Sequence, residues 1–451
     1  MPAIVTDALR RQIAQDFFDQ FTNDTRKYYI AIGRSEQWDS SDTVPTPTNT
    51  PTTVEAFRNS MQSVKKVEAT SLVVPRNNWA SGAIYSQYDD QQGGYPTNPY
   101  YVITEDNQVY VCLETGRDAT GAAVPSTVKP TQANLESRRE SDGYVWKFLY
   151  TISAERANNF MSANFMPTLL QGATDSNSTG IQLKQKAVQD AATPGEILSV
   201  IITDGGAGYT SKPTITITDP SGTGASVNVT IDSATGQVVR IRMDDSTNGD
   251  IAGHGSGYTN PLVSISGGGA TLNATARAVL GPDSGIGRDP REDLKSASVM
   301  FHSELAGTDS DFIVNQDFRQ VGLVRDIRDR NNNIFNNTTG NTLKSMTMSS
   351  IITDFTADKI IEGQTTLARA YIDEIDSNII YYHQTSDTGF IQFQDGELIE
   401  ETNGGGEGVI DSATIQPRVL PSTGEVLFID NRSPIDRSTA QNEDIKVIIQ
   451  F

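Results

Sequence analysis

The chain has 451 residues, a length that allows two to four domains. Its apolar content is 36%, and its 37 glycines and 19 prolines indicate a mainly β protein with many turns. The formal net charge of -21 repels phosphate, so the composition disfavours nucleic acid and anionic membranes as partners.

The sequence shows neither a signal-peptide pattern at its start nor an apolar run long enough to span a membrane. It contains a single cysteine, Cys112, so an intrachain disulfide is impossible. Because Cys112 lies in the apolar run 109–113, we predict a buried core residue rather than a reactive thiol. We therefore expect a protein that is made and assembled in a reducing cytoplasm.

The first predicted element is a helix close to the N-terminus. Its apolar residues recur every four positions and form one stripe, made of Leu9, Ile13, Phe17 and Phe21. Thr6 or Asp7 can cap the first turn of this helix. The stripe predicts a helix that packs on its own domain; the alternative is an arm that docks on a neighbouring subunit.

Predicted strands follow in both halves of the chain. In the first half, apolar patterns predict strands at 27–33, 69–75, 100–104, 108–113 and 143–152. In the second half, they predict strands at 298–301, 320–324, 363–370, 379–383 and 390–393. At the C-terminal end, we expect the strands at 425–429 and 445–451 to pair with each other across a polar link.

An internal repeat occupies the Gly-rich and Thr-rich region 195–282. Each copy has a strand, a Gly-rich turn, a tyrosine, a second strand, a second Gly turn and a third strand. The first copy aligns Gly206–Thr210 with Gly255–Thr259 of the second, and we also align Gly222–Ala225 with Gly267–Ala270. Strands rather than a helix follow the glycines, which favours turns over a phosphate-binding loop. We predict that the two copies bury their apolar faces against each other.

Side chains that could carry catalysis or hold a metal do not gather in the sequence. The three histidines, His254, His302 and His383, lie in separate segments, and one cysteine cannot complete a zinc site. The segment Asp244–Gly249, with Ser246 and Asn248, resembles a calcium loop, but Gly255 stands where the twelfth-position carboxylate is needed. We expect no enzyme, no catalytic residue, no metal and no cofactor.

Five short stretches resemble one family in the same order along the chain. They are Tyr29–Trp38, Val74–Trp79, Asp142–Tyr150, Phe318–Val321, and the C-terminal segment Gly424–Ile435 with Glu443–Phe451. Together they resemble the dimeric baseplate wedge subunit of contractile-tailed, T-even-like bacteriophages. The positions that carry the resemblance, as structural or interface residues, are Gly33, Arg34, Ser35, Glu36, Trp38, Pro75, Arg76, Trp79, Tyr144, Trp146, Phe318, Arg319, Gln320, Gly424, Glu425, Asn431, Arg432, Pro434 and Phe451.

The resemblance implies a multi-layer β-sandwich core in a virion protein of the tail baseplate, assembled in the host cytoplasm. Its partners would be a second copy of itself and other wedge proteins, with no small-molecule substrate. The regions that do not match are expected to be two inserted small β modules. The expected division is 1–190 for the N-terminal part of the core, 191–283 for the Gly-rich repeat module, 284–330 for a core segment, 331–420 for the second module and 421–451 for the C-terminal core strands.

Two other functions remain open from the residues alone. Gly-rich and Thr-rich β repeats also occur in tail fibres and spikes, which would be trimeric and would bind cell-surface glycans. A tail-associated polysaccharide depolymerase would need two carboxylates in one cleft, and so acidic a chain does not exclude such a pair. The tryptophans and arginines of the matched stretches, among them Trp38, Trp79 and Arg432, could anchor interfaces or could simply pack and brace their own domains.

Overall fold

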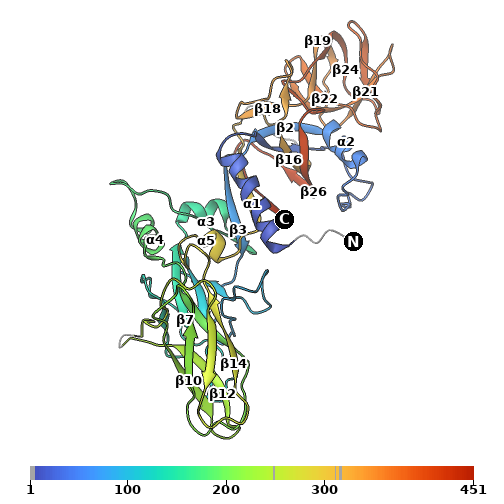
Figure 1. The fold of residues 1–451 in the computed structure, drawn as a ribbon. Coiled ribbons are helices and arrows are strands. Elements are labelled where there is room, and N and C mark those ends of the chain that lie inside the picture. The colour runs from blue at the N-terminus through green and yellow to red at the C-terminus, as the bar shows by residue number, and fades with distance from the viewer. Residues whose placement is uncertain (1–5, 247–248, 310, 314–316) are drawn as a thin grey trace. The chain divides into compact units, whose positions relative to one another are not determined.

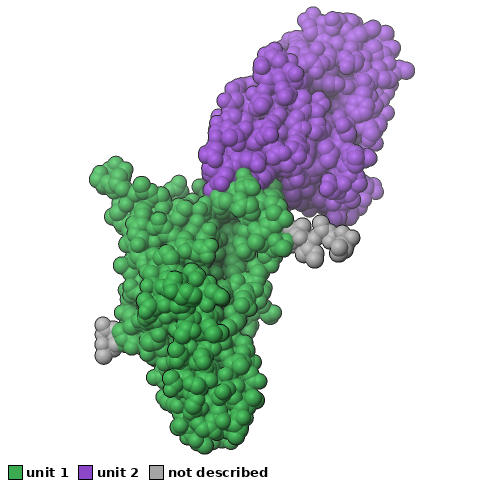
Figure 2. Space-filling view, in the orientation of Figure 1, with its two compact units in different colours: residues 1–16, 71–300, 449–451 green, residues 17–70, 301–448 purple. Residues whose placement is uncertain are grey.

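The computed structural model describes residues 6–246, 249–309, 311–313 and 317–451. The protein is mainly β, with 40% strand and 11% helix, and it begins with a helix, as the sequence predicts. Two compact units share the chain (Figure 2). Unit 1 comprises Met1–Asp16, Ser71–Met300 and Ile449–Phe451, and unit 2 comprises Phe17–Thr70 and Phe301–Ile448.

Helix α1 spans Asp7–Thr22, and the Thr6 hydroxyl accepts a hydrogen bond from the Leu9 amide at 3.3 Å, which confirms the predicted cap. The apolar stripe is used unevenly. The Phe17 ring lies edge-on to Phe301, with the ring centroids 5.7 Å apart, whereas the Leu9 side chain is 47% exposed. None of the helices in the described ranges is both long and apolar enough to cross a membrane.

Unit 2 is built on an antiparallel five-stranded sheet in the order β18-β2-β1-β16-β26. Its strands are β1 (Tyr28–Gly33), β2 (Met61–Lys66), β16 (Asp317–Arg325), β18 (Thr339–Asn341) and β26 (Glu425–Asp436). Strand β1 is central, and all of its residues are buried, which explains its continuous apolar sequence. Helix α2 (Pro51–Asn59) buries Phe57 against this sheet in a core with Tyr29 and Val324. A short pair joins β17 (Arg328–Asp329) to β25 (Val419–Leu420).

Unit 2 also contains a closed six-stranded barrel in the order β19-β22-β21-β20-β23-β24, drawn in orange in Figure 1. Its strands are β19 (Lys344–Thr353), β20 (Ile360–Gly363), β21 (Arg369–Asp376), β22 (Ile379–His383), β23 (Leu398–Glu401) and β24 (Glu407–Ile415). All of the pairings are antiparallel, and the interior holds Met346, Ile361, Ile372, Ile380, Tyr382 and Ile399, each at most 1% exposed. Closure leaves this sheet without an unpaired edge.

Unit 1 holds an antiparallel sheet in the order β4-β5-β7-β6 and the two-stranded ladders of the repeat region. The sheet is made of β4 (Tyr101–Ile103), β5 (Gln108–Glu114), β6 (Arg138–Arg139) and β7 (Val145–Thr151). Cys112 lies opposite Trp146 and is fully buried, as predicted. The helices of this unit are α3 (Ala154–Phe160), α4 (Gly180–Ala191) and α5 (Pro290–Asp293). Apart from the sheets assigned to one unit, the chain forms a sheet in the order β27-β15-β3-β8, from β3 (Ala69–Pro75), β8 (Phe165–Pro167), β15 (Ser298–Ala306) and β27 (Asn442–Gln450).

The repeat region folds by pairing one copy with the other. The first copy supplies β9 (Ile197–Asp204), β10 (Thr214–Thr218) and β11 (Val227–Asp232), and the second supplies β12 (Gln237–Met243), β13 (Leu262–Ser266) and β14 (Thr275–Leu280). Strand β9 pairs with β14, β12 pairs with β11, and the two middle strands, β10 and β13, pair with each other. This exchange gives the module an approximate two-fold axis through the β10-β13 ladder.

Equivalent hydrogen bonds confirm the two-fold relation. The Tyr209 hydroxyl accepts from the Ala274 amide at 2.8 Å, and the Tyr258 hydroxyl accepts from the Ala225 amide at 3.0 Å. These bonds make Ala225 equivalent to Ala274. The sequence alignment of Gly222–Ala225 with Gly267–Ala270 is therefore wrong, because a run of glycines gave it a false register.

Three strand predictions in the C-terminal half also fail. The segment 363–370 contains a turn between β20 and β21, where Leu367 has a φ of +61°. The segment 390–393 is not a strand, and Phe390 is 54% exposed. The two C-terminal strands do not pair with each other: β26 pairs with β16, and β27 belongs to another sheet. The alternation of apolar residues predicts which face of a strand is buried, but it does not predict which strand pairs with it.

We predict that Tyr209→Phe and Tyr258→Phe destabilise the repeat module equally. Each substitution leaves an amide without its acceptor, the buried amide of Ala274 or the part-buried amide of Ala225, which costs about 1–3 kcal/mol in the free energy of unfolding. Native-state hydrogen exchange of the amides in β10 and β13 measures this loss. Tyr381→Phe serves as the control, because no hydrogen bond through the Tyr381 hydroxyl occurs in the described part of the chain. Unequal losses would argue against the two-fold relation.

Candidate functional site

Residues of the five matched stretches gather in two clusters, one inside each unit. In unit 2, the first, fourth and fifth stretches meet; we name the group formed by Arg34, Ser35, Glu36, Trp38, Arg319, Gln320, Asn431 and Arg432 the polar cluster. In unit 1, the second and third stretches meet; we name the group formed by Trp79, Tyr144 and Trp146, with Tyr85, the aromatic cluster. The sequence order alone gave no sign of this grouping.

The polar cluster begins where β1 ends. The register of β1 against β2 shifts between Ile32 and Gly33, and a Cβ on Gly33 would lie 2.5 Å from the Ser60 carbonyl oxygen, so a larger residue does not fit. The next residue, Arg34, has a φ of +64° and donates its amide to the Ser60 carbonyl at 2.9 Å. This sharp turn directs the following residues, through Trp38, along the end of the sheet.

Arg319 joins the first and fourth stretches. Its side chain is 5% exposed, and its Nε and Nη2 atoms donate to Asp42 at 3.0 and 3.1 Å. Its Nη1 atom donates to Asp317 at 2.6 Å and to the Ser35 carbonyl. Its amide donates to the Arg34 carbonyl at 2.9 Å. A bidentate arginine–carboxylate pair of this kind fixes orientation as well as distance.

The fifth stretch joins the cluster through Asn431 and Arg432. Gln320 donates from Nε2 to the Asn431 side-chain oxygen at 2.9 Å. The Trp38 indole N–H donates to the Arg432 carbonyl at 3.0 Å, and the Arg34 guanidinium stacks 4.2 Å from the Trp38 ring centroid. Three stretches that lie far apart along the chain thus form one hydrogen-bonded group.

A buried histidine ties the polar cluster to the barrel. His383, at the end of β22, places Nδ1 2.6 Å from Asp373 Oδ2, and its Nε2 lies 3.3 Å from Glu36 Oε2, within ion-pair distance but outside hydrogen-bond geometry. Asp373, in β21, also accepts from Gln62 Nε2 at 3.0 Å. The Tyr371 ring stacks on His383, with the centroids 5.4 Å apart. The two carboxylates therefore hold the imidazole from both sides.

Electrostatics make this histidine a cation. Burial lowers the pKa of His383, but Asp373 and Glu36 outweigh it and raise the pKa to about 10. Burial also acts to raise the pKa of Glu36, yet His383 and Arg34 keep that pKa below its ordinary value. Because both ring nitrogens face carboxylates, neither is available as a general base. The arrangement points to a structural ion pair, and sequence reasoning missed it because Glu36 is remote from the other two residues.

The aromatic cluster is a packed core with one polar bridge. Trp146 is 3% exposed, stacks on Tyr144 with the centroids 5.9 Å apart, and meets Tyr85 edge-on at 5.4 Å. The Trp79 indole N–H donates to the Ser126 hydroxyl at 3.2 Å, and that hydroxyl donates to Asp142 Oδ2 at 3.1 Å. This bridge links the second stretch to the third. Trp146 therefore packs inside its own unit, which is the second of the two roles that the sequence left open for the tryptophans.

The other matched residues lie outside the two clusters or at their margins. Arg76 braces a loop by donating to Asn78 and to the Ser162 carbonyl, and the Pro75 carbonyl accepts from the Tyr101 hydroxyl. The remaining positions are Phe318, buried in β16; Gly424, whose carbonyl accepts from Arg58; Glu425, paired with Arg325; Pro434, exposed; and Phe451, whose amide donates to the Ala297 carbonyl. Arg432 has a side chain that is 59% exposed, so it stays a candidate interface residue.

Groups of three or more metal-ligating side chains close enough to hold an ion do not occur within the described ranges. Asn248 of the calcium-like segment lies outside the described residues. No protein-family model matches the chain, and no curated protein matches it in sequence.

We predict that His383→Gln lowers the free energy of unfolding by about 3–5 kcal/mol, because it leaves two buried carboxylates without their cation. Adding Asp373→Asn should recover part of the loss by removing one of these charges. Hydrogen exchange measures each loss in the strands next to the substituted residue, which are the barrel strands for His383 and strand β9 for a control at His254. His254→Gln is the matched control: burial lowers the pKa of His254 to about 4, so this histidine is neutral and its loss strands no charge. Equal losses in the two single variants would contradict the ion pair.

The same pair predicts how stability depends on pH. The pKa of His383 is about 10 in the folded protein and near 6.5 when unfolded, so its contribution is complete below pH 6.5 and is lost as the pH rises to 10. The wild-type protein should therefore lose more stability than His383→Gln between pH 7 and pH 10. Urea denaturation of both proteins at these two pH values measures the difference. If both proteins lose the same amount of stability, groups other than His383 determine the pH dependence.

Proposed function

We propose that the protein is a non-enzymatic structural subunit of a baseplate wedge in a contractile phage tail. The observation that carries this proposal is the set of five stretches, matched in order, that resemble the dimeric wedge subunit. Their convergence into the polar and aromatic clusters supports the proposal, because it gives the matched residues a shared structural reason to occur together.

Under this proposal, the protein works by holding geometry rather than by chemistry. The bidentate pair of Arg319 with Asp42 and the pair of His383 with Asp373 fix the sheet end and the barrel of unit 2. Subunits that transmit rearrangement need such rigid bodies, because packed cores move as wholes rather than deform. Association would occur with a second copy and with other wedge proteins through interfaces that typically bury about 2,000 Å² or more.

The proposal predicts a dimer that joins a larger complex. Light scattering after size exclusion should give the mass of two chains for the protein alone, and a larger stoichiometric complex after co-expression with the neighbouring tail proteins. A stable trimer that ignores those proteins would contradict the proposal and favour a host-binding fibre or spike.

A variant pair sharpens this test. Arg432→Glu reverses the charge of the exposed matched residue, whose side chain lies 2.6 Å from Asp430, and should weaken either the dimer or its complex if Arg432 lies in an interface. Arg330→Glu makes the same charge change at an exposed residue outside the matched stretches and should leave both assemblies intact. If the two variants behave alike, Arg432 is not an interface residue.

A further inference from the structure

A pocket in unit 1 gathers positive charge within a strongly acidic chain. Its volume is about 290 Å³, at the lower end of the range for small-molecule sites. Four arginines line it, namely Arg117, Arg139, Arg240 and Arg242. Among the described lining residues, Glu114 is the one carboxylate. The local charge therefore opposes the net charge of -21 carried by the whole chain.

The pocket exists because of how the two repeat copies meet. Strands β9 and β12 are the equivalent first strands of the two copies, and they lie side by side without sharing a ladder, since each pairs elsewhere. Hydrogen bonds join them to the opposite copy at their ends, as when the Val238 amide donates to the Gly205 carbonyl at 2.8 Å. The gap between two unpaired neighbouring strands remains open as the pocket.

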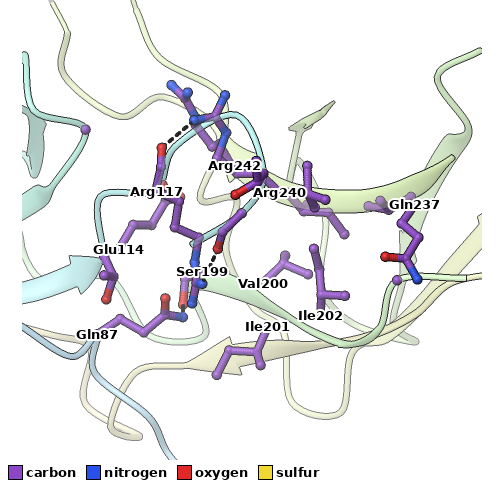
Figure 3. A pocket seen from close by; sticks show the side chains of 18 of the residues that line it. Gln87, Glu114, Arg117, Ser199, Val200, Ile201, Ile202, Gln237, Arg240 and Arg242 are labelled. Atoms are coloured by element: carbon purple, nitrogen blue, oxygen red, sulfur yellow. Dashed lines mark hydrogen bonds between the residues drawn. The ribbon is translucent and has the colours of Figure 1, made fainter. Parts of the chain in front are cut away.

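The two-fold relation is broken at this gap. Arg240 and Arg242 of the second copy correspond to Ser199 and Ile201 of the first, and all four residues line the pocket. Figure 3 shows Arg117, Arg240 and Arg242 gathered on one side, with the aliphatic side chains of β9 below them. The strand pairing does not require arginines at these positions, because the first copy has Ser199 and Ile201 there and forms the equivalent ladder.

The arginines differ in whether their charge is already balanced. Arg139 is saturated: it donates to Glu114 at 2.6 Å and to Asp245 at 2.9 Å. Glu114 in turn accepts the Met243 amide at 2.8 Å through its other oxygen, so each oxygen of this carboxylate already has a partner.

Arg240 and Arg242 have no such partner. The Nε atom of Arg240 is buried without a hydrogen bond in the described structure, although its Nη1 donates to the Arg117 carbonyl at 2.9 Å and its Nη2 donates to the Thr230 hydroxyl at 3.4 Å. No ion pair or hydrogen bond of the Arg242 guanidinium occurs among the described residues, although this residue is half-buried. Burial is the largest cause that lowers the pKa of both arginines, and repulsion from neighbouring arginines, above all Arg139 at Arg240 and Arg240 at Arg242, lowers it further.

We propose that this pocket binds a phosphate or sulfate group, either as the free ion or carried on a small molecule such as a sugar phosphate. Guanidinium groups match the oxygen geometry of such anions and bind them through paired, charge-assisted hydrogen bonds. The Ser199 hydroxyl accepts from Gln87 at 3.0 Å and keeps its own proton to donate from the opposite strand. The expectation that the whole chain repels phosphate does not hold locally, and the proposal is independent of a role in a baseplate.

Isothermal titration tests the site with three probes: inorganic phosphate, glucose 6-phosphate and glucose. We expect saturable binding of the phosphate-bearing probes and none of glucose. Equal affinity for both phosphates identifies the free ion as the ligand, and tighter binding of glucose 6-phosphate identifies a carried group. The proposal is overturned if neither phosphate binds at about 10 mM, or if glucose binds as tightly as its phosphate.

Variants locate the binding. Arg242→Gln should weaken phosphate binding about tenfold or more, and it removes no hydrogen bond that the described structure contains. Arg240→Gln should have a similar effect, but it also loses the hydrogen bonds to Arg117 and Thr230, so its folding is checked by circular dichroism. Arg330→Gln is the control for a lost exposed charge and should leave the affinity unchanged. Unchanged affinity in a folded Arg242→Gln protein would overturn the proposal.

Discussion

The buried contact of His383 with Asp373 and Glu36 is the interaction on which the internal order of unit 2 depends. Its three members come from β22, from β21 and from the turn after β1, so one imidazolium holds a barrel to the end of a sheet. Buried ions are costly unless they are paired, so the contact requires all three residues to be in place together. Such an interaction specifies one arrangement of the elements more than it adds net stability.

Arg319 is a second buried cation that joins separate segments of unit 2. It satisfies Asp42, Asp317 and two backbone carbonyls, and its neighbour Gln320 reaches Asn431. The first, fourth and fifth matched stretches are therefore parts of one network. In unit 1, the aromatic cluster joins the second and third matched stretches through ring packing and one bridging hydroxyl, that of Ser126. Short motifs that look unrelated in sequence are thus joined by direct contacts within each unit.

Much of the fold could be predicted from the sequence, because strand β3, strand β22 and the first helix show strong local patterns. The pairing of the C-terminal strands could not, since their partners, β16 and β15, lie far from them in the sequence. The candidate site divides in the same way. Trp38 and Arg319 stood in recognisable motifs, whereas Asp373 and His383 gave no local signal. The arginine pocket was equally hidden, because its charges come from three separate segments, around Arg117, Arg139 and Arg240.

The exchange of strands between the repeat copies also constrains the order of events during synthesis. Strand β9 is among the first parts of the module to leave the ribosome, but its partner β14 is the last. Neither copy can complete a ladder for its first or middle strand alone, so the module stays open until Leu280 has emerged. Contacts of such long sequence separation form slowly and expose strand edges in the meantime. The Gly-rich, weakly apolar composition of this region limits aggregation through those exposed edges until translation reaches the end of the second copy.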